Sequence, residues 1–306
     1  MTMIPEPTET AVASPTVAVE TPLVRTEQRG SLLHRTLAAV VPPLVVLVFV
    51  IGVWYFVSYV VLDRRRQFLL HPPHQVIREG FLDRDNLAEI LDGLWSSMRV
   101  AAVGLVISIV LGVFIAVVMS QAKIIERAWF PFLVTLQAIP ILALVPMIQF
   151  WFGSDWRARV LVCVIISFFP IVLNTLFGLL SADAGLHDLI TLHRGGRWTR
   201  LTKVMFPSAL PAMFAGLRIA AGLSVIGAIV GDFFFGLGDV GLGQLIRKYS
   251  LNTNYGEQLL AAVIISSLLG ITVFYGVVCL VNIRRVLGIA REIDSHSTAN
   301  QGPADG

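Results

Sequence analysis

The sequence predicts an all-α polytopic membrane protein with six transmembrane helices, and three observations support this fold class. The chain has 306 residues, of which 56% are hydrophobic and 14% are charged, whereas soluble domains are about 25% charged. Apolar runs of about 20 residues, the length that crosses a bilayer as a helix, occur six times. These runs lack the polar face that helices on a soluble core carry.

The six predicted spans define one transmembrane domain over residues 37–290. Five spans contain no Lys, Arg, Asp or Glu, and the fifth contains a single charge, Arg218. The spans cover residues 38–61, 100–119, 128–154, 160–182, 208–231 and 258–283. Pro140, Pro146 and Pro170 lie inside the third and fourth spans, where each removes a helix hydrogen bond. They indicate either static kinks or a moving pathway.

The two ends of the chain differ from this domain. Residues 1–36 are rich in Thr, Pro, Glu and Val and have no helical period, which predicts a disordered cytoplasmic tail. No apolar region follows a basic start within the first 30 residues, so a signal peptide is not expected. Residues 291–306 are predicted to form a second disordered tail.

Basic residues in the loops predict the orientation of the spans. Six spans place both termini on one side, and that side carries twelve Lys and Arg residues against ten on the other. The "DRRR" run at 63–66 opposes this small bias, and acids in the same loop partly balance it. We expect a multi-pass protein of the plasma membrane with both termini in the cytoplasm.

Groups that perform chemistry within a membrane are scarce. All six histidines lie outside the spans, and no span holds an Asp or Glu away from its ends. Intramembrane hydrolases, proton pumps and metal transporters need such groups at depth. Cys163 and Cys279 lie inside spans and are interpreted as small apolar fillers. We therefore predict no catalytic residue, no metal site and no cofactor.

Two further functions are not indicated. The chain has no GxxxxGK[ST] phosphate loop, so it does not hydrolyse ATP through that motif. Its formal net charge of +3 is too small to indicate a nucleic-acid partner.

The loop between the fourth and fifth spans, residues 183–207, is longer and more basic than a helix connection requires. The segment "DLITLH" has helix-forming character, Gly195 and Gly196 follow it, and "RWTRLTKVMF" resumes a helical period. The apolar stripe of this second segment consists of Trp198, Leu201, Val204 and Met205. The pattern predicts two short helices bent at the glycines, with Pro207 ending the second. Such an element either lies on the membrane surface or presents a knob to a cytoplasmic partner.

This loop resembles the permease signature of bacterial ABC importers, which runs from Glu-Ala-Ala through a glycine to Ile-x-Leu-Pro. When the two are registered on Pro207, the acid, the two alanines, the glycine and the last leucine fall on Asp188, Leu189, Ile190, Arg194 and Phe206. The spacing from acid to proline is kept, whereas the residue types differ and the glycine has moved by one position to Gly195.

Five other stretches resemble the nitrate, sulfonate and taurine group of these permeases, and they occur in the order of that group. They are "SSMRVAAVG" at 96–104, "TLQAIPILALVPMIQFWFG" at 135–153, "SFFPIVLNTLFGL" at 167–179, "FPSALPAMFAGLRIAAG" at 206–222 and "GDFFFGLGDVGLGQLI" at 231–246. Asp232 stands where that group usually has Glu. The chain is identified as a member of this permease group.

The resemblance implies a type I ABC importer permease fold in a bacterial plasma membrane, and it implies a set of partners. Two cytosolic ATPase subunits bind ATP and dock on the permease loops, an extracytoplasmic binding protein delivers the solute, and a second permease copy or paralogue completes a dimer. The residues expected at the ATPase are Asp188, Leu189, Ile190, Gly195, Gly196, Arg197, Phe206 and Pro207. The permease itself is expected to be a non-catalytic subunit.

Arg218 is the one charge expected deep in the membrane. Asn174 of the neighbouring fourth span lies at a matching depth and is its expected partner. Asp232 lies fourteen residues further along, about 21 Å on a straight helix, and is too distant to pair with Arg218. These three residues are candidates either for a structural clamp between helices or for the lining of a solute pathway.

The solute class stays open between two groups of compounds. One is a small anion such as a sulfonate or nitrate, for which only Arg218 is available within the spans. The other is a planar organic vitamin precursor, such as a pyrimidine or a riboflavin-like molecule, which aromatic side chains would stack against.

The glycine-rich stretch 236–243 is expected to be irregular and to lie at the outer face. The alternative to an ABC importer permease is a secondary transporter or a membrane scaffold that works without an ATPase.

Overall fold

The computed structural model describes residues 32–63, 66 and 69–299, and every regular element among them is helical. The chain divides into two units, 1–52 and 53–306. Helix α1 (Leu32–Phe56) begins in the first unit and continues as the π-helical turn η1 (Val57–Val61) in the second.

The second unit contains four long helices: α3 (Arg84–Ser120), α6 (Trp156–Leu180), α9 (Phe206–Phe234) and α11 (Gly256–Ala299). With α1, the described residues include five helices long and apolar enough to cross a membrane. A sixth span results if the bent pair α4 (Lys123–Ala138) and α5 (Ile141–Phe152) counts as one. The predicted all-α polytopic membrane fold is confirmed.

The third predicted span, 128–154, is not a continuous helix. It breaks between α4 and α5, whose axes differ by 95°. Ile139 has extended backbone angles and Pro140 is the N-cap of α5. A residue before proline is driven out of the helical region by the proline ring. Pro140 therefore breaks the segment, whereas Pro146 and Pro170 lie inside helices that continue through them.

Several helices are longer than the uncharged windows that predicted them. Helix α3 begins at Arg84 because the Asp83 carboxylate caps it, accepting from the Asp85 amide at 3.0 Å. Helix α1 begins at Leu32, so residues 32–36 are not part of a tail, and residues 1–31 lie outside the described chain. Helix α11 continues to Ala299, so most of the predicted tail 291–306 is helical. Charges end the apolar stretch but do not end a helix.

The prediction that Pro207 ends the second loop helix is wrong. Helix α8 (Arg197–Arg200) runs through the π-helical turn η4 (Leu201–Met205) directly into α9, so residues Arg197–Phe234 form one continuous rod. Pro207 lies in the first turn of α9, immediately after η4. Proline is tolerated there because a π-type turn already displaces the regular hydrogen-bond ladder.

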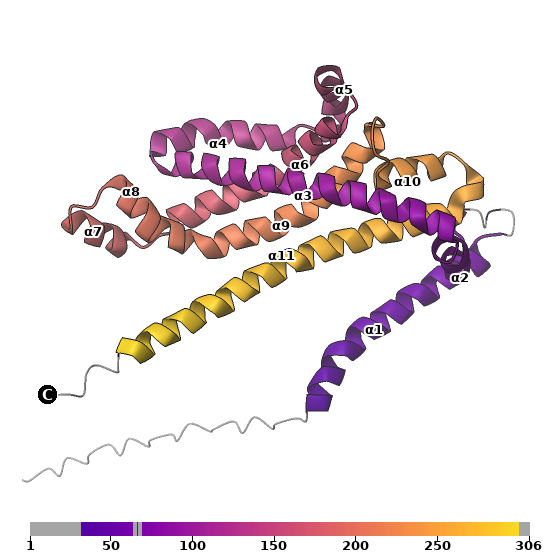
Figure 1. Ribbon diagram of the computed structural model, residues 1–306, viewed down its shortest axis with the longest axis horizontal. Helices are drawn as coiled ribbons and strands as arrows, with labels where there is room; N and C mark the ends of the chain where they lie inside the picture. Colours follow the sequence, from indigo (N-terminus) through magenta and orange to yellow (C-terminus); the bar gives the residue numbers. More distant parts are fainter. Residues whose placement is uncertain (1–31, 64–65, 67–68, 300–306) are drawn as a thin grey trace, which may run out of the picture. The chain divides into compact units, whose positions relative to one another are not determined.

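The smaller elements lie at the two ends of α9 (Figure 1). Helix α7 (Ala184–Leu192) and α8 lie at its beginning. Helix α10 (Leu242–Ser250), the 3-10 turn η5 (Thr253–Tyr255), α2 (Pro73–Gln75) and η3 (Val76–Phe81) lie toward the other end. The largest apolar core joins α3, α6, α9, α10 and α11 and includes Val100, Val225, Leu242 and Ile265.

Small residues allow α3, α6 and α9 to pack against one another at short distance (Figure 1). A Cβ atom on Gly227 of α9 would lie 2.7 Å from the Cα atom of Cys163 of α6. One on Gly216 would lie 2.6 Å from the Cβ atom of Asn174. From the third helix, Gly104 of α3 packs against the Cys163 side chain. Cys163 is therefore buried where three helices meet, as expected for a small filler.

Replacing Gly227 by leucine is expected to prevent these helices from packing. The new side chain would overlap the α6 backbone, and such overpacking typically costs about 1–3 kcal/mol or more. We expect little monodisperse protein after detergent extraction, as measured by size-exclusion chromatography. The control is Gly276→Leu in α11, where no atom lies within 4 Å of an added Cβ. Equal yields from both variants would contradict the packing argument.

Candidate functional site

The loop that precedes α9 carries the residues of the permease signature, and it folds into the two predicted short helices. Asp183 caps α7 by accepting from the Gly185 amide at 2.7 Å. At the other end of α7, the Gly195 amide donates to the Ile190 carbonyl at 2.8 Å and the Arg194 amide donates to the Thr191 carbonyl at 3.0 Å. These two bonds are the Schellman pattern that ends a helix.

The bend lies at Arg194 rather than at the glycine pair. Arg194 has φ of +53°, the left-handed conformation that glycine adopts most readily, and both Gly195 and Gly196 have negative φ. This is the position on which the signature glycine falls. Gly195 is needed for a different reason, because an added Cβ would lie 2.6 Å from Ile190 Cγ2. The bend of this chain therefore lies at the position of the signature glycine, and arginine occupies it.

The loop exposes an apolar knob, formed by Leu186, Leu189, Leu192 and Trp198. Leu192 is 80% exposed and Trp198 is 74% exposed. Trp198 therefore does not belong to the predicted apolar stripe, whose other members, Leu201, Val204 and Met205, are buried. Arg200 joins the two helices by donating to the Thr191 hydroxyl at 3.1 Å.

The predicted loop residues fall into two groups. Ile190 and Gly195 are half-buried within the bend. The exposed ones are Asp188, Leu189, Gly196, Arg197, Phe206 and Pro207. A partner protein can therefore reach most of the signature positions directly.

A buried ion pair lies at the opposite end of α9. Arg159 and Asp232 are both fully buried, and Arg159 Nη1 lies 3.2 Å from Asp232 Oδ1. The Ser97 hydroxyl donates to Asp232 Oδ2 and in turn accepts from the Leu242 amide at 2.8 Å. The pair thus joins α3, α6, α9 and the start of α10.

The segment 235–241 contacts this pair, and residues 236–241 are irregular, as predicted for the glycine-rich stretch. Arg159 donates to the carbonyl oxygens of Asp239 at 2.8 Å and Leu237 at 3.0 Å. Side chains at Gly241 or Gly243 would overlap Asp232, so glycine is required at both positions. The remaining part of the stretch, from Leu242, is the first turn of α10.

Helix α10 is fixed to α3 by a second polar cluster. Lys248 Nζ and the Tyr249 hydroxyl donate to the two oxygens of Glu89 at 2.6 and 2.8 Å. Burial and the neighbouring Glu89 carboxylate raise the pKa of Tyr249, so its hydroxyl stays protonated and keeps donating.

The predicted contact between Arg218 and Asn174 is not formed. The two helices do pack together, but the Asn174 amide donates to the Pro170 carbonyl of its own helix at 2.8 Å. Gly216 faces Asn174, and Arg218, two residues on, points away into a groove between α9 and α11. Among the described residues, Arg218 Nε has no hydrogen-bond partner.

Sequence reasoning missed Arg159 and Ser97. Arg159 directly precedes the fourth predicted span and Asp232 directly follows the fifth, so both were assigned to the loops. The sequence signal for this pair is the position of the two charges at the ends of neighbouring spans. Two opposite charges border neighbouring antiparallel spans at the same end.

Comparisons with known proteins place these features in one family. Residues 108–286 match the family described as the binding-protein-dependent transport system inner membrane component. The chain belongs to this family.

Three relatives illustrate its range. The formylaminopyrimidine transport permease protein of Halalkalibacterium halodurans is 35% identical over 218 residues, 71% of this chain and 84% of that protein. The riboflavin transport system permease protein of Chloroflexus aurantiacus is 38% identical over 128 residues, 42% and 47% of the two chains. The putative aliphatic sulfonates transport permease protein of Bacillus subtilis is 28% identical over 182 residues, 60% and 65%.

Family membership gives the general role of this chain. It is the inner-membrane permease component of a binding-protein-dependent ABC importer for small solutes.

Replacing Arg194 of the permease by glycine is expected to stabilise the α7–α8 bend. An L-residue in the left-handed conformation costs about 1 kcal/mol relative to glycine, and the greater freedom of unfolded glycine offsets part of this gain. Backbone amides of residues 190–196 should exchange with deuterium a few-fold more slowly. Gly196→Ala is the control, since its φ is negative and no atom lies within 4 Å of the added methyl. Faster exchange in Arg194→Gly would refute this account.

Removing one member of the buried ion pair is expected to be far more harmful than removing both. Asp232→Ala leaves the Arg159 charge buried without its partner, which typically costs about 3–5 kcal/mol. The double variant Arg159→Met, Asp232→Leu should recover part of the loss in thermal unfolding of the detergent-solubilised protein. Asp239→Ala, which breaks the exposed pair with Arg99, should change the unfolding temperature little. A double variant no more stable than Asp232→Ala would argue against charge burial as the cause.

Proposed function

We propose that this protein forms the solute pathway of an ATP-driven importer and that the α7–α8 loop docks on the ATPase subunits. The observation that carries the proposal is the exposed apolar knob at the position of the permease signature. Leucine and tryptophan side chains that lie 45–80% exposed on an otherwise charged loop are suited to a groove on a partner protein. ATP is bound by that partner.

The continuous rod from Arg197 to Phe234 supports mechanical coupling. It spans 38 residues, about 57 Å at the helical rise. A movement of the knob at Trp198 would therefore be carried to the Arg159–Asp232 end of the molecule along one continuous helix. Packed helices shift as rigid units, so closure of the ATPases would move both ends of α9 together.

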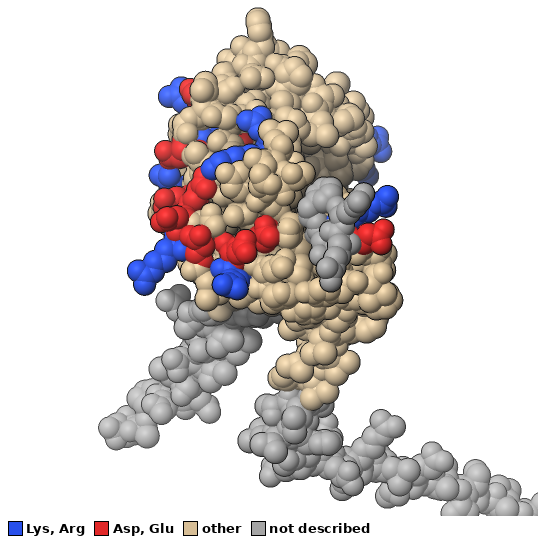
Figure 2. Space-filling view, turned by 90° about the vertical axis from the view of Figure 1, so that its right-hand side faces the viewer, with Lys and Arg blue, Asp and Glu red and all other residues tan. Residues whose placement is uncertain are grey.

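The proposal also fixes the orientation. Docking on a cytosolic ATPase places α7 and α8 in the cytoplasm, and an even number of spans then places both termini there. The opposite end, which Figure 2 faces, presents acidic and basic side chains around a larger uncharged surface. It includes the exposed acids Asp83, Asp85 and Asp92 and the Lys248–Glu89 pair. We assign the solute-binding protein to this end.

Arg218 and its groove form the proposed pathway side of the molecule. The groove between α9 and α11 has a volume of 690 Å³ and is mainly apolar, with Arg218 as its charged residue. A second permease copy or paralogue facing this groove would enclose it and supply acceptors to Arg218. Loss of uptake by an Arg218→Ala complex that still assembles would support a pathway group. Loss of assembly would instead indicate that Arg218 holds the two permeases together.

We propose two classes of solute, a planar vitamin precursor and a small anion, because the relatives are named as permeases for compounds of these two classes. A secondary transporter or a scaffold without an ATPase remains the second candidate. This candidate is favoured by the poor match between the loop and the permease signature, since Leu189 and Ile190 stand in place of two alanines.

The docking knob gives a direct test. Leu189→Asp combined with Trp198→Ala should reduce copurification with the partner ATPase at least tenfold, because the knob loses most of its apolar surface. The control is Leu82→Asp at the opposite end, which is also strongly exposed. Normal copurification and ATP-dependent uptake in the knob variant would overturn the coupling role of the loop.

A further inference from the structure

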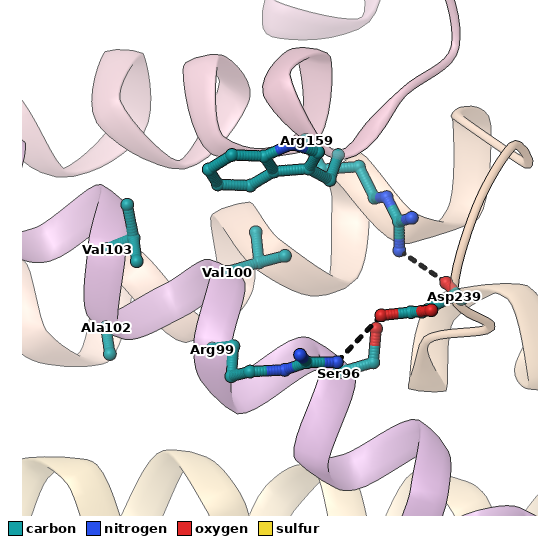
Figure 3. A pocket seen from close by; sticks show the side chains of 8 residues that line it. Ser96, Arg99, Val100, Ala102, Val103, Arg159 and Asp239 are labelled. Carbon is teal, nitrogen blue, oxygen red and sulfur yellow. Dashed lines mark hydrogen bonds and ion pairs between the residues drawn. The ribbon is translucent and has the colours of Figure 1, made fainter.

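A second cavity, separate from the Arg218 groove, lies between α3 and α6 beside the segment 235–241. Its volume is 480 Å³, which falls within the range of about 300–1,000 Å³ typical of small-molecule sites. The residues that decide its chemistry are Ser96, Arg99 and Val103 of α3, Trp156 and Arg159 of α6, and Asp239 (Figure 3).

The cavity has apolar walls and one large aromatic surface. Ser96, Arg99 and Val103 follow the spacing that places residues on one face of a helix. Trp156 and Arg159 share a face of α6 by the same rule. The Trp156 side chain is half-exposed, so part of its indole remains available to a ligand. A planar ring is the group that an open indole face and aliphatic walls bind best.

The charges around the cavity are already balanced within the protein. Arg99 Nη2 lies 2.7 Å from Asp239 Oδ2, and Arg159 pairs with Asp232 (Figure 3 shows the Arg99 contact). An anion entering the cavity would meet each arginine beside its paired carboxylate. The lining therefore offers an anion no net positive charge.

One hydrogen-bond donor at the cavity is nevertheless unused. Both terminal nitrogens of Arg159 are occupied, by the Asp232 carboxylate and by the carbonyls of Leu237 and Asp239. The Nε atom of the same side chain has no partner, although the side chain is only 1% exposed. A buried donor without an acceptor is unfavourable. A neutral acceptor on a ligand, such as a ring nitrogen or a carbonyl oxygen, would satisfy it after a small shift of the Arg159 side chain that exposes Nε to the cavity and keeps both ion pairs.

We propose that this cavity is a solute subsite for an uncharged planar heteroaromatic compound that carries at least one hydrogen-bond acceptor. The ring stacks on Trp156 between the α3 and α6 walls, and the acceptor meets Arg159 Nε. Nitrate, bicarbonate and small sulfonates are disfavoured, because they would fill little of the cavity and meet only compensated cations. The assignment rests on the proposed importer function and selects one of its two solute classes.

The test uses the full chain in lipid nanodiscs and measures binding of two uncharged probes, riboflavin and cytosine, by saturation-transfer NMR. Val103→Trp places an indole in the cavity and should weaken probe binding at least tenfold. The matched control is Val110→Trp, on the same helix, strongly exposed and outside the cavity. Trp156→Ala removes the stacking surface at a half-exposed position and should also weaken binding, whereas Trp156→Phe should retain most of it.

The outcomes separate this inference from the importer function. Competition of the probes with each other, but not with nitrate, bicarbonate or methanesulfonate, is the expected result. The assignment is overturned if neither probe binds, if Val103→Trp and Trp156→Ala bind as the unaltered protein does, or if the anions displace the probes. In each of those cases, loss of ATPase copurification in the Leu189→Asp, Trp198→Ala variant would leave the importer function standing. Normal copurification together with absent probe binding would remove both.

Discussion

The close antiparallel packing of α6 against α9 is the constraint on which the rest of the structure depends. A side chain at Gly216 or Gly227 of α9 would overlap the α6 backbone, and a Cβ atom on Gly231 would lie only 3.0 Å from the Cα atom of Arg159. In a bilayer, helices associate through such small-residue contacts, since lipid is as apolar as the helix surface. This packing places Arg159 beside Asp232 at one end of the pair. At the other end it holds Gly178 against Ala209, next to the coupling loop.

A displacement at one end of this helix pair would be transmitted to the other end if α9 moves as a rigid unit. Because η4 passes the chain from α8 into α9 without a break, a displacement at Trp198 is not absorbed before the membrane. At the far end, Asp232 is bound to α3 through Ser97 and to the segment 235–241 through Arg159. A shift of α9 along α6 would strain these contacts first. The proposed ATPase movement and the proposed outer solute subsite are thus connected through a single rod.

The all-α membrane fold, the positions of the apolar spans and the two-helix form of the loop could be predicted from the sequence, because apolar run length and helical period are local properties. The break at Pro140 and the continuity through Pro207 could not, because every proline disfavours a helix, yet the chain breaks at Pro140 and continues through Pro146, Pro170 and Pro207. The prediction of a contact between Arg218 and Asn174 was wrong for a geometric reason. Matching depth does not fix the side of a helix, and Gly216 rather than Arg218 faces α6. The Arg159–Asp232 pair was missed because spans were defined by the absence of charge.

The charge balance near the outer end bears on how such a permease selects its solute. Arg99 and Arg159 are matched by Asp239 and Asp232, so the cavity between α3 and α6 carries no standing net charge. A site of this kind discriminates by shape, stacking and a single donor rather than by long-range attraction. Its affinity would be modest and nearly independent of ionic strength. Modest affinity suits a pathway that receives concentrated solute from a binding protein and must release it again, since tight binding within the membrane would slow release.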